Sequence, residues 1–407
     1  MQYSSFILPN GLRIIHLPSD SPVSYCGFTV NAGTRDEQSG KYGLAHFVEH
    51  MLFRGTEKRK VHYILNRMEA VGGELNAYTT KEETFIYTVC LHEDVERAIE
   101  LLSDLIYHSQ FSESEIEKER EVVIDEIHAY EDSPSELIFD EFENMLFAGS
   151  DLGHAILGEV ESLQSFTSAS CRDFTNNYYR PENMVFFSYG KAPFPRILRY
   201  VEKYSPMIFP VTTNPLLRNR PELSPAETSI QNKNLHQTHV VTGGKAYGLF
   251  DDKRMGLLLL NNVLGGPGMN SRLNVSMREK YGLVYSVDAE VVSYTDTGMF
   301  SIYFGCDPES MEQCLHLLFK ELKYMRERKL SGSQLAAAVK QWKGQLGIAS
   351  EHKENIALRL GKIFLHFNKY EPLPQTYQKI DALTAEDLLE ISNEIYDEKQ
   401  LFSLIFQ

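Results

Sequence analysis

The spacing of apolar residues divides the first half of the chain into short strands and longer helices. Apolar or alternating runs predict strands near 5–8, 12–17, 23–32, 74–79, 84–91 and 183–190. Apolar residues three or four positions apart predict helices near 43–53, 60–71, 93–108, 112–132, 134–147, 167–179 and 193–204. Because strands and helices are mixed without regular alternation, the pattern indicates the α+β class.

The second half repeats this kind of pattern. It predicts strands near 227–246, 284–293, 298–306 and 401–407, and helices near 251–264, 270–280, 309–328, 331–350, 352–366 and 384–396. Residues 101–127 align with residues 317–346, since each segment reads as a helix, a turn with a serine N-cap and a second helix. The two halves therefore look like copies of one domain.

A proline-rich stretch without sustained periodicity, residues 205–225, separates the two halves. A chain of 407 residues is also too long for one ordinary hydrophobic core. We therefore predict an N-terminal domain at 1–210, a linker at 211–225 and a C-terminal domain at 226–407.

Composition narrows the classes of function. The formal net charge of -16 argues against nucleic acid or an anionic membrane as a partner and is compatible with cationic peptide substrates. No stretch approaches the roughly 20 apolar residues that span a bilayer, and the first residues lack the features of a secretory signal, so we expect a cytoplasmic protein. The 5 cysteines are scattered singly, which favours reduced thiols.

The predicted helix near 43–53 carries the pattern His-x-x-Glu-His. Residues four apart share one helix face, so His46 and His50 can direct both imidazoles to one point, with Glu49 beside them. The rest of this helix is apolar, and burying these three side chains without partners would cost several kcal/mol. A zinc ion would remove that cost, and Glu49 could then act as the general base.

A third ligand must come from another segment, and the helix near 112–127 offers two carboxylates. A run of Glu and Lys is usually a solvated helix face. However, Glu119 and Glu126 lie seven residues apart on one stripe, and Glu126 has Val122, Val123, Ile124 and Ile127 as neighbours. This setting favours Glu126 as the metal ligand and Glu119 as a residue that orients a histidine.

These residues and their spacing resemble those of the pitrilysin/insulinase zinc metallopeptidases, the inverted-motif zincins, and within them the short two-domain branch similar to the mitochondrial processing peptidase. In that family a ligand Glu follows the motif by about 76 residues, with another Glu seven residues before it, and Glu126 and Glu119 stand at these positions after His50. The resemblance implies Glu126 as ligand and two duplicated α/β-sandwich domains, each an antiparallel-rich mixed sheet covered by helices.

Two further segments match the family. Residues 74–87 resemble its edge strand, which binds substrate through backbone hydrogen bonds; the residues concerned would be Asn76, Ala77, Tyr78 and Thr79. Taken alone, this alternation suits any exposed strand equally well. Residues 260–286 resemble the segment with the family's Arg and Tyr pair, here Arg278 and Tyr285, which would bind substrate and stabilise the oxyanion. Without the resemblance, Arg278 reads as a surface residue.

The second copy lacks the metal residues. Aligning Gly43-Leu44 with Gly256-Leu257 puts Leu259, Asn262 and Val263 opposite the His-x-x-Glu-His residues, while Ala338 and Gln345 stand opposite the two later glutamates. One zinc ion per chain is expected. In short members of the family the metal half of one subunit faces the Arg/Tyr half of another, so the resemblance implies a homodimer whose active site is completed by the partner's C-terminal domain.

The sequence therefore predicts a zinc-dependent endopeptidase that hydrolyses extended or unfolded peptides. The alternative is a non-catalytic subunit that binds peptides or scaffolds an active partner in a heterodimeric peptidase, but such proteins usually lose part of the motif. Histidine and carboxylate ligands also accept manganese, cobalt or iron. The short glycine-rich turn at 265–268 departs from the mitochondrial pattern and favours a bacterial-type enzyme that cuts peptides rather than presequences.

Overall fold

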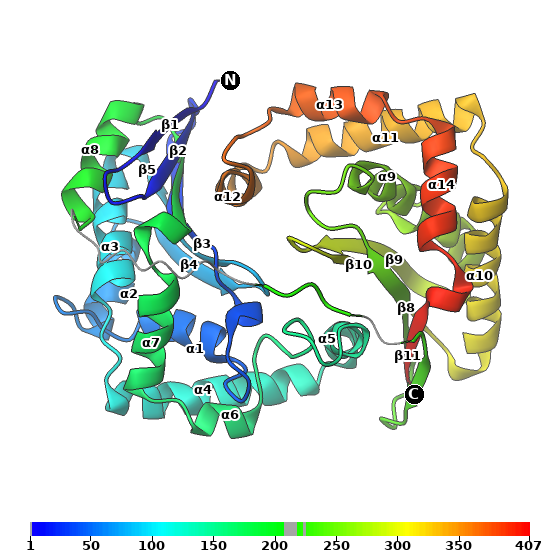
Figure 1. The fold of residues 1–407 in the computed structure, drawn as a ribbon, viewed down its shortest axis with the longest axis horizontal. Coiled ribbons are helices and arrows are strands. Elements are labelled where there is room, and N and C mark those ends of the chain that lie inside the picture. Colours follow the sequence, from blue (N-terminus) through cyan, green and yellow to red (C-terminus); the bar gives the residue numbers. More distant parts are fainter. Residues whose placement is uncertain (1, 207–217, 223–224) are drawn as a thin grey trace. The chain divides into compact units, whose positions relative to one another are not determined.

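The computed structural model describes residues 2–206, 218–222 and 225–407, and its contacts divide the chain into two compact units. The first unit comprises Met1–His128, Ala155–Arg218 and Ala349–Pro372, and the second comprises Ala129–His154, Asn219–Ile348 and Leu373–Gln407. Each unit contains one mixed sheet covered by helices, so the predicted α+β class is confirmed (Figure 1).

The sheet of the first unit has the strand order β1-β2-β6-β3-β5-β4. Only β2 and β6 run parallel; the other neighbours are antiparallel. The strands are β1 (Ser4–Ile7), β2 (Arg13–Pro18), β3 (Val23–Val30), β4 (Glu74–Thr79), β5 (Thr84–Leu91) and β6 (Met184–Gly190). The helices of this unit are α1 (Leu44–Leu52), α2 (Val61–Glu69), α3 (Val95–His108), most of α4 (Glu113–Glu131), α6 (Val160–Gln164), α7 (Ser168–Tyr178), α8 (Phe194–Tyr204) and α12 (Lys353–Phe367).

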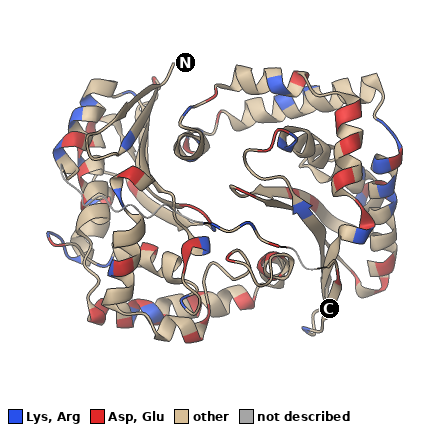
Figure 2. Cartoon of the chain, viewed as in Figure 1, with Lys and Arg blue, Asp and Glu red and all other residues tan. Residues whose placement is uncertain are grey.

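The sheet of the second unit has the order β7-β11-β8-β10-β9. Its strands are β7 (Thr228–Gln231), β8 (Thr238–Ala246), β9 (Val284–Ser293), β10 (Gly298–Cys306) and β11 (Phe402–Phe406). The helices are α5 (Pro134–Leu146), α9 (Arg254–Gly265), α10 (Met311–Glu327), α11 (Gly332–Ala349), α13 (Leu373–Asp381) and α14 (Ala385–Ile395). Charged residues concentrate on the helices and loops of both units, while the strands carry few (Figure 2).

The two sheets confirm the predicted duplication. Strands β2-β6-β3-β5-β4 and β7-β11-β8-β10-β9 follow the same order, and in both sheets the first pair is parallel while the others are antiparallel. Strand β1 is an addition to the first sheet. In each unit the first α-helix after the third strand of the shared order, α1 after β3 or α9 after β8, packs against the edge strand, β4 or β9.

One helix from each half of the sequence packs on the sheet of the other unit. Helix α5 follows α4 in the chain but packs on β8 and β11 of the second sheet, and α12 follows α11 but packs on β6 and β3 of the first. The compact units therefore differ from the two continuous domains predicted at 1–210 and 226–407. Local periodicity shows that a helix has an apolar face, but it does not show which sheet covers that face. Most of the predicted linker at 211–225 lies outside the described residues.

Most predicted elements are present, with three local differences. The strand predicted at 227–246 is divided into β7 and β8, and the helix predicted at 270–280 contains a π-helical segment, Asn274–Glu279. Helices α6 and α13 are absent from the prediction, because α6 has only five residues and two prolines, at 372 and 374, interrupt the pattern at the start of α13. Among the described residues, no helix combines the length and apolar character needed to cross a membrane.

Candidate metal centre

Helix α1 is buried along almost its whole length, and its first turn is fixed by an acidic residue outside it. Gly43 precedes the helix with φ +91°, a left-handed conformation that favours glycine. The Glu37 carboxylate accepts hydrogen bonds from the backbone N–H groups of Gly43 (2.9 Å) and Ala45 (2.6 Å). Because a helix N-terminus presents free N–H groups and partial positive charge, this carboxylate stabilises the start of α1.

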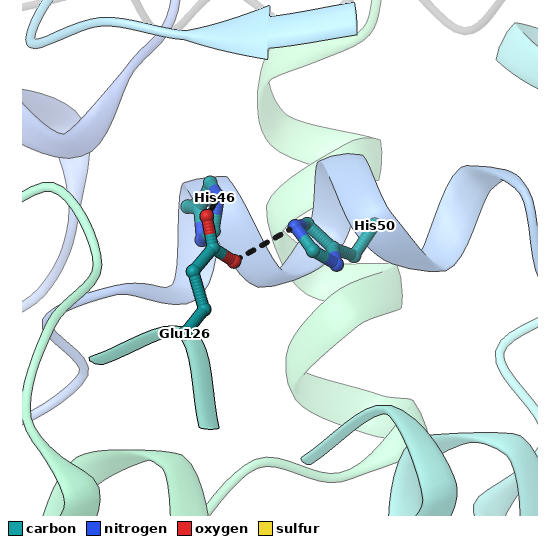
Figure 3. A group of neighbouring side chains, drawn as sticks. All are labelled: His46, His50 and Glu126. Atoms are coloured by element: carbon teal, nitrogen blue, oxygen red, sulfur yellow. Dashed lines mark ion pairs between the residues drawn. The ribbon is translucent and has the colours of Figure 1, made fainter. Parts of the chain in front are cut away.

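The structure brings His46, His50 and Glu126 together (Figure 3). The Nε2 atom of His46 lies 3.9 Å from Glu126 Oε1, and the Nε2 atom of His50 lies 3.5 Å from Glu126 Oε2. All three ligand atoms lie within 4.8 Å of one another. Ligand atoms around a tetrahedral zinc ion are about 3.4 Å apart, so small side-chain adjustments would close this set on an ion.

The surroundings of the two imidazoles suit metal ligation. Burial, with a contribution from nearby His50, lowers the pKa of His46 to about 3, so this ring is neutral at pH 7. The Nδ1 atom of His50 lies 2.9 Å from Glu119 Oε1, which leaves Nε2 directed at Glu126. Neutral imidazole is the form that binds zinc, and a carboxylate on the other ring nitrogen fixes the ring orientation.

Glu119 is itself held by a second partner. Its Oε2 forms an ion pair with Arg54, two residues beyond the end of α1. Burial would raise the pKa of the Glu119 carboxyl, but the hydrogen bonds to His50 and Arg54 outweigh burial and lower it. Glu119 is therefore ionised at neutral pH and able to orient His50.

Glu49 is buried on α1 beside the three ligand residues, with 7% of its surface exposed. The Thr79 hydroxyl donates a hydrogen bond of 2.8 Å to Glu49 Oε2. Burial raises the pKa of the Glu49 carboxyl to about 7, against the lowering effects of Thr79 and His50. A pKa near the working pH is the property that a general base requires.

Strand β4 lies at the edge of the first sheet and is hydrogen-bonded only to β5 within that sheet. Its side chains alternate between two faces. Leu75 and Ala77 pack against the buried cluster that includes α1. Tyr78 packs against the cluster that includes α12 and stacks on Phe85, with 4.6 Å between ring centroids. The outer backbone edge of β4 therefore has no partner strand in this sheet.

Arg278 and Tyr285 lie in the second unit. Arg278 is part of the π-helical segment, 3.8 Å from Glu279, and Tyr285 follows the first residue of β9 with 87% of its surface exposed. Arg278 is half-buried and Tyr285 is exposed, so neither residue is buried in the core of its unit. Among the described residues, the three ligand residues of the first unit form the only cluster suited to a metal ion.

Comparisons with known proteins agree with this geometry. Residues 14–160 match the family model described as insulinase (peptidase family M16), and residues 165–342 match the model described as peptidase M16 inactive domain. An uncharacterized zinc protease of Bacillus subtilis is 31% identical, covering 97% of this chain and 96% of that protein. Another, from Streptomyces coelicolor, is 30% identical, covering 98% and 88%. This chain belongs to the M16 peptidase family.

Solved structures confirm the M16 fold. A protease from Helicobacter pylori aligns with a TM-score of 0.92 at 20% identity, covering 100% of this chain and 99% of that one. A structure from Pseudomonas fluorescens described as a peptidase M16 inactive domain aligns with a TM-score of 0.90 at 18% identity, covering 100% and 98%. The resemblance to the insulinase group and its short two-domain branch is confirmed.

Three residues around this M16 site were not given their roles by the sequence interpretation. Glu37 lies seven residues before the start of α1, too far for an ordinary N-cap, and Arg54 has no motif of its own. Thr79 is predicted to line the substrate strand through its backbone, and its side chain in addition donates a hydrogen bond to Glu49. The only sequence signal for the contact between Thr79 and Glu49 is the position of Thr79 at the end of a predicted strand.

Proposed function

We propose that this M16 protein is a zinc-dependent endopeptidase that hydrolyses extended or unfolded peptides. One observation carries the proposal: a buried carboxylate, Glu49, lies on the same helix as two imidazoles that converge with Glu126. The names of the relatives as zinc proteases support zinc as the ion. One ion per chain follows, because the second copy has Leu259, Asn262 and Val263 at the corresponding positions.

His46, His50 and Glu126 would hold the ion and, as three ligands of a four-coordinate ion, would leave one position for water. The Glu126 side chain is 44% exposed, so solvent reaches this side of the ligand set. A bound zinc ion lowers the pKa of a water ligand to about 7 and polarises the substrate carbonyl. Glu49 would accept the proton from the attacking water and donate it to the leaving amine. A substrate peptide would add to the edge of β4 along Asn76, Ala77, Tyr78 and Thr79, which restricts cleavage to extended chains.

Arg278 and Tyr285 would complete the site from the C-terminal domain of a second copy in a homodimer. An Arg side chain is suited to holding the substrate backbone, and a Tyr hydroxyl can donate a hydrogen bond to the developing oxyanion. The exposure of Tyr285 supports such a role, because an aromatic residue so exposed has little to contribute to its own core. We further propose a cytoplasmic location.

The substitution Glu49→Gln tests the proposal. It preserves side-chain size and removes the base, so we expect zinc to be retained while kcat for an extended peptide falls by about 10²–10⁴. Zinc is measured by elemental analysis and cleavage by a fluorogenic peptide assay. Glu69→Gln on α2, an exposed position, is the matched control and should cleave normally. Undiminished cleavage by Glu49→Gln with zinc bound would refute Glu49 as the base.

A further inference from the structure

Thr79 connects the edge strand to the proposed base. It is the last residue of β4, it pairs with Thr84 of β5, and only 9% of its surface is exposed. Its backbone belongs to the strand proposed to receive the substrate. Its side chain, however, lies on the face where α1 packs against β4, and Oγ1 donates 2.8 Å to Oε2 of Glu49.

This hydrogen bond restricts the orientation of a long side chain. Glu49 has three rotatable bonds before its carboxylate, and within the described residues the structure contains no other hydrogen bond to that carboxylate. With Oε2 engaged by the hydroxyl, Oε1 is the oxygen left to exchange a proton. A hydroxyl is well suited to this task, since it donates to a carboxylate without bringing a second charge close to the metal ligands.

We propose that Thr79 is a positioning residue for the peptidase reaction, whose hydroxyl holds the Glu49 carboxylate in the orientation for proton transfer. This inference rests on the proposed function and gives the Thr79 side chain a role beside that proposed for its backbone. The threonine acts through Glu49 and does not contact the scissile bond. Its loss therefore affects the chemical step more than substrate binding, which depends on the β4 backbone.

The substitution Thr79→Val tests this role, because it keeps the shape of the side chain and removes only the hydroxyl. We expect kcat to fall by about 10–100-fold, the cost of a misplaced catalytic group, with KM changed by less than about threefold. Thr79→Ser restores the donor and is expected to recover most of the wild-type kcat. Zinc content and the unfolding temperature are measured on each variant.

Thr88→Val is the matched control. Thr88 is another buried threonine of the same sheet, but it lies on β5 and its hydroxyl contacts Cys26. It measures the cost of losing any buried hydroxyl from this sheet, and we expect its kcat to equal that of the wild type. A fall in kcat for Thr79→Val beyond that of Thr88→Val, at full zinc content, supports the inference.

The outcomes separate this inference from the proposed function. If the wild type with bound zinc cleaves no peptide, the peptidase proposal fails and the role of Thr79 fails with it. If the wild type cleaves but Thr79→Val is equally active, only the inference is overturned. It is also overturned if Thr79→Val loses zinc, if Thr79→Ser is no better than Thr79→Val, or if KM rather than kcat carries the change.

Discussion

Helices α1 and α9 occupy equivalent places in the two units, each before an edge strand, and they bury different side chains there. In α1 the buried positions include His46 and Glu49, while α9 has Leu259 and Asn262 at the aligned positions. The sheets beside them have the same strand order and directions. The fold therefore forms without the histidine and glutamate residues, and their burial in α1 is a cost that the fold does not require.

The same contrast appears on the helices that follow. Glu119 and Glu126 on α4 correspond to Ala338 and Gln345 on α11, and Ala338 is the only residue of α11 that is buried. In the first unit a buried carboxylate at this place orients His50; in the second, a methyl group fills it. The two units thus share one fold, but only the first has the residues that could bind a metal ion.

Replacing His46 by the residue of the second copy gives the largest expected effect. In His46→Leu we expect zinc to fall from one ion per chain to none and peptide cleavage to fall at least about 10³-fold, because the ion and its water are lost. The metal-free variant should be more stable than the metal-free wild type by about 1 kcal/mol, since it removes a buried Nδ1 atom without a partner in the described structure. Elemental analysis, cleavage assays and denaturant unfolding in chelator measure these effects.

The reciprocal change, Leu259→His, is the control. It buries an imidazole in the second unit without a carboxylate to orient it, so we expect no second zinc ion and a loss of about 1–3 kcal/mol in stability. A His46→Leu variant less stable than the wild type, both without metal, would show that the histidine contributes to folding and would contradict the contrast drawn between α1 and α9.

The second expected effect concerns the residues that two subunits of a homodimer would contribute to one active site. If the base of one subunit works with Tyr285 of another, two inactive variants should complement each other. Mixing Glu49→Gln with Tyr285→Phe, after subunit exchange, should restore at most roughly one quarter of wild-type activity, because half of the dimers are mixed and each has one intact site. The measurement is cleavage rate against mixing time. No recovery despite proven exchange would place both residues of a working site on one chain.

The sequence was informative where chemistry depends on short or fixed spacing. His46, Glu49 and His50 form a motif on one helix, and Glu126 was favoured by its apolar neighbours and the resemblance; the structure brings its carboxylate to the two rings. Spacing along the chain does not predict contacts between different helices and strands. The bond from Thr79 to Glu49 depends on how α1 packs on β4, and no periodicity encodes that packing.

The exchanged helices show the same limit and a further contrast between the units. Helix α5 packs on the second sheet through fully buried apolar residues, Ile138, Phe142 and Leu146. Helix α12 adds charge to its apolar contacts with the first sheet. Glu83 lies 2.6 Å from His366 Nε2 and 3.1 Å from Lys362 Nζ, and only 3% of its surface is exposed. Helix α5 also has an ionic contact, between Glu141 and Lys233, but that pair is partly exposed to solvent whereas Glu83 is almost fully buried. Because solvent screens the exposed pair, acid should weaken the anchoring of α12 more than that of α5.

The substitution Glu83→Gln sharpens this contrast and has the smallest expected effect. Burial raises the pKa of the Glu83 carboxyl, but His366 and Lys362 outweigh burial and lower it from 4.5 to about 2. Because the folded pKa lies below the unfolded one, the ionised carboxyl contributes stability above pH 4.5 and loses it as the pH falls towards 2, by about 3 kcal/mol in full. Denaturant unfolding of the chelator-treated protein between pH 7 and pH 3 should therefore show that the wild type is more stable than Glu83→Gln, by an amount that shrinks as the pH falls.

The exposed Glu351→Gln is the control, and its free energy of unfolding should equal that of the wild type at every pH. An advantage that stays constant with pH would mean that Glu83 acts through shape rather than charge, and that the anchoring of α12 does not depend on its ionic contacts.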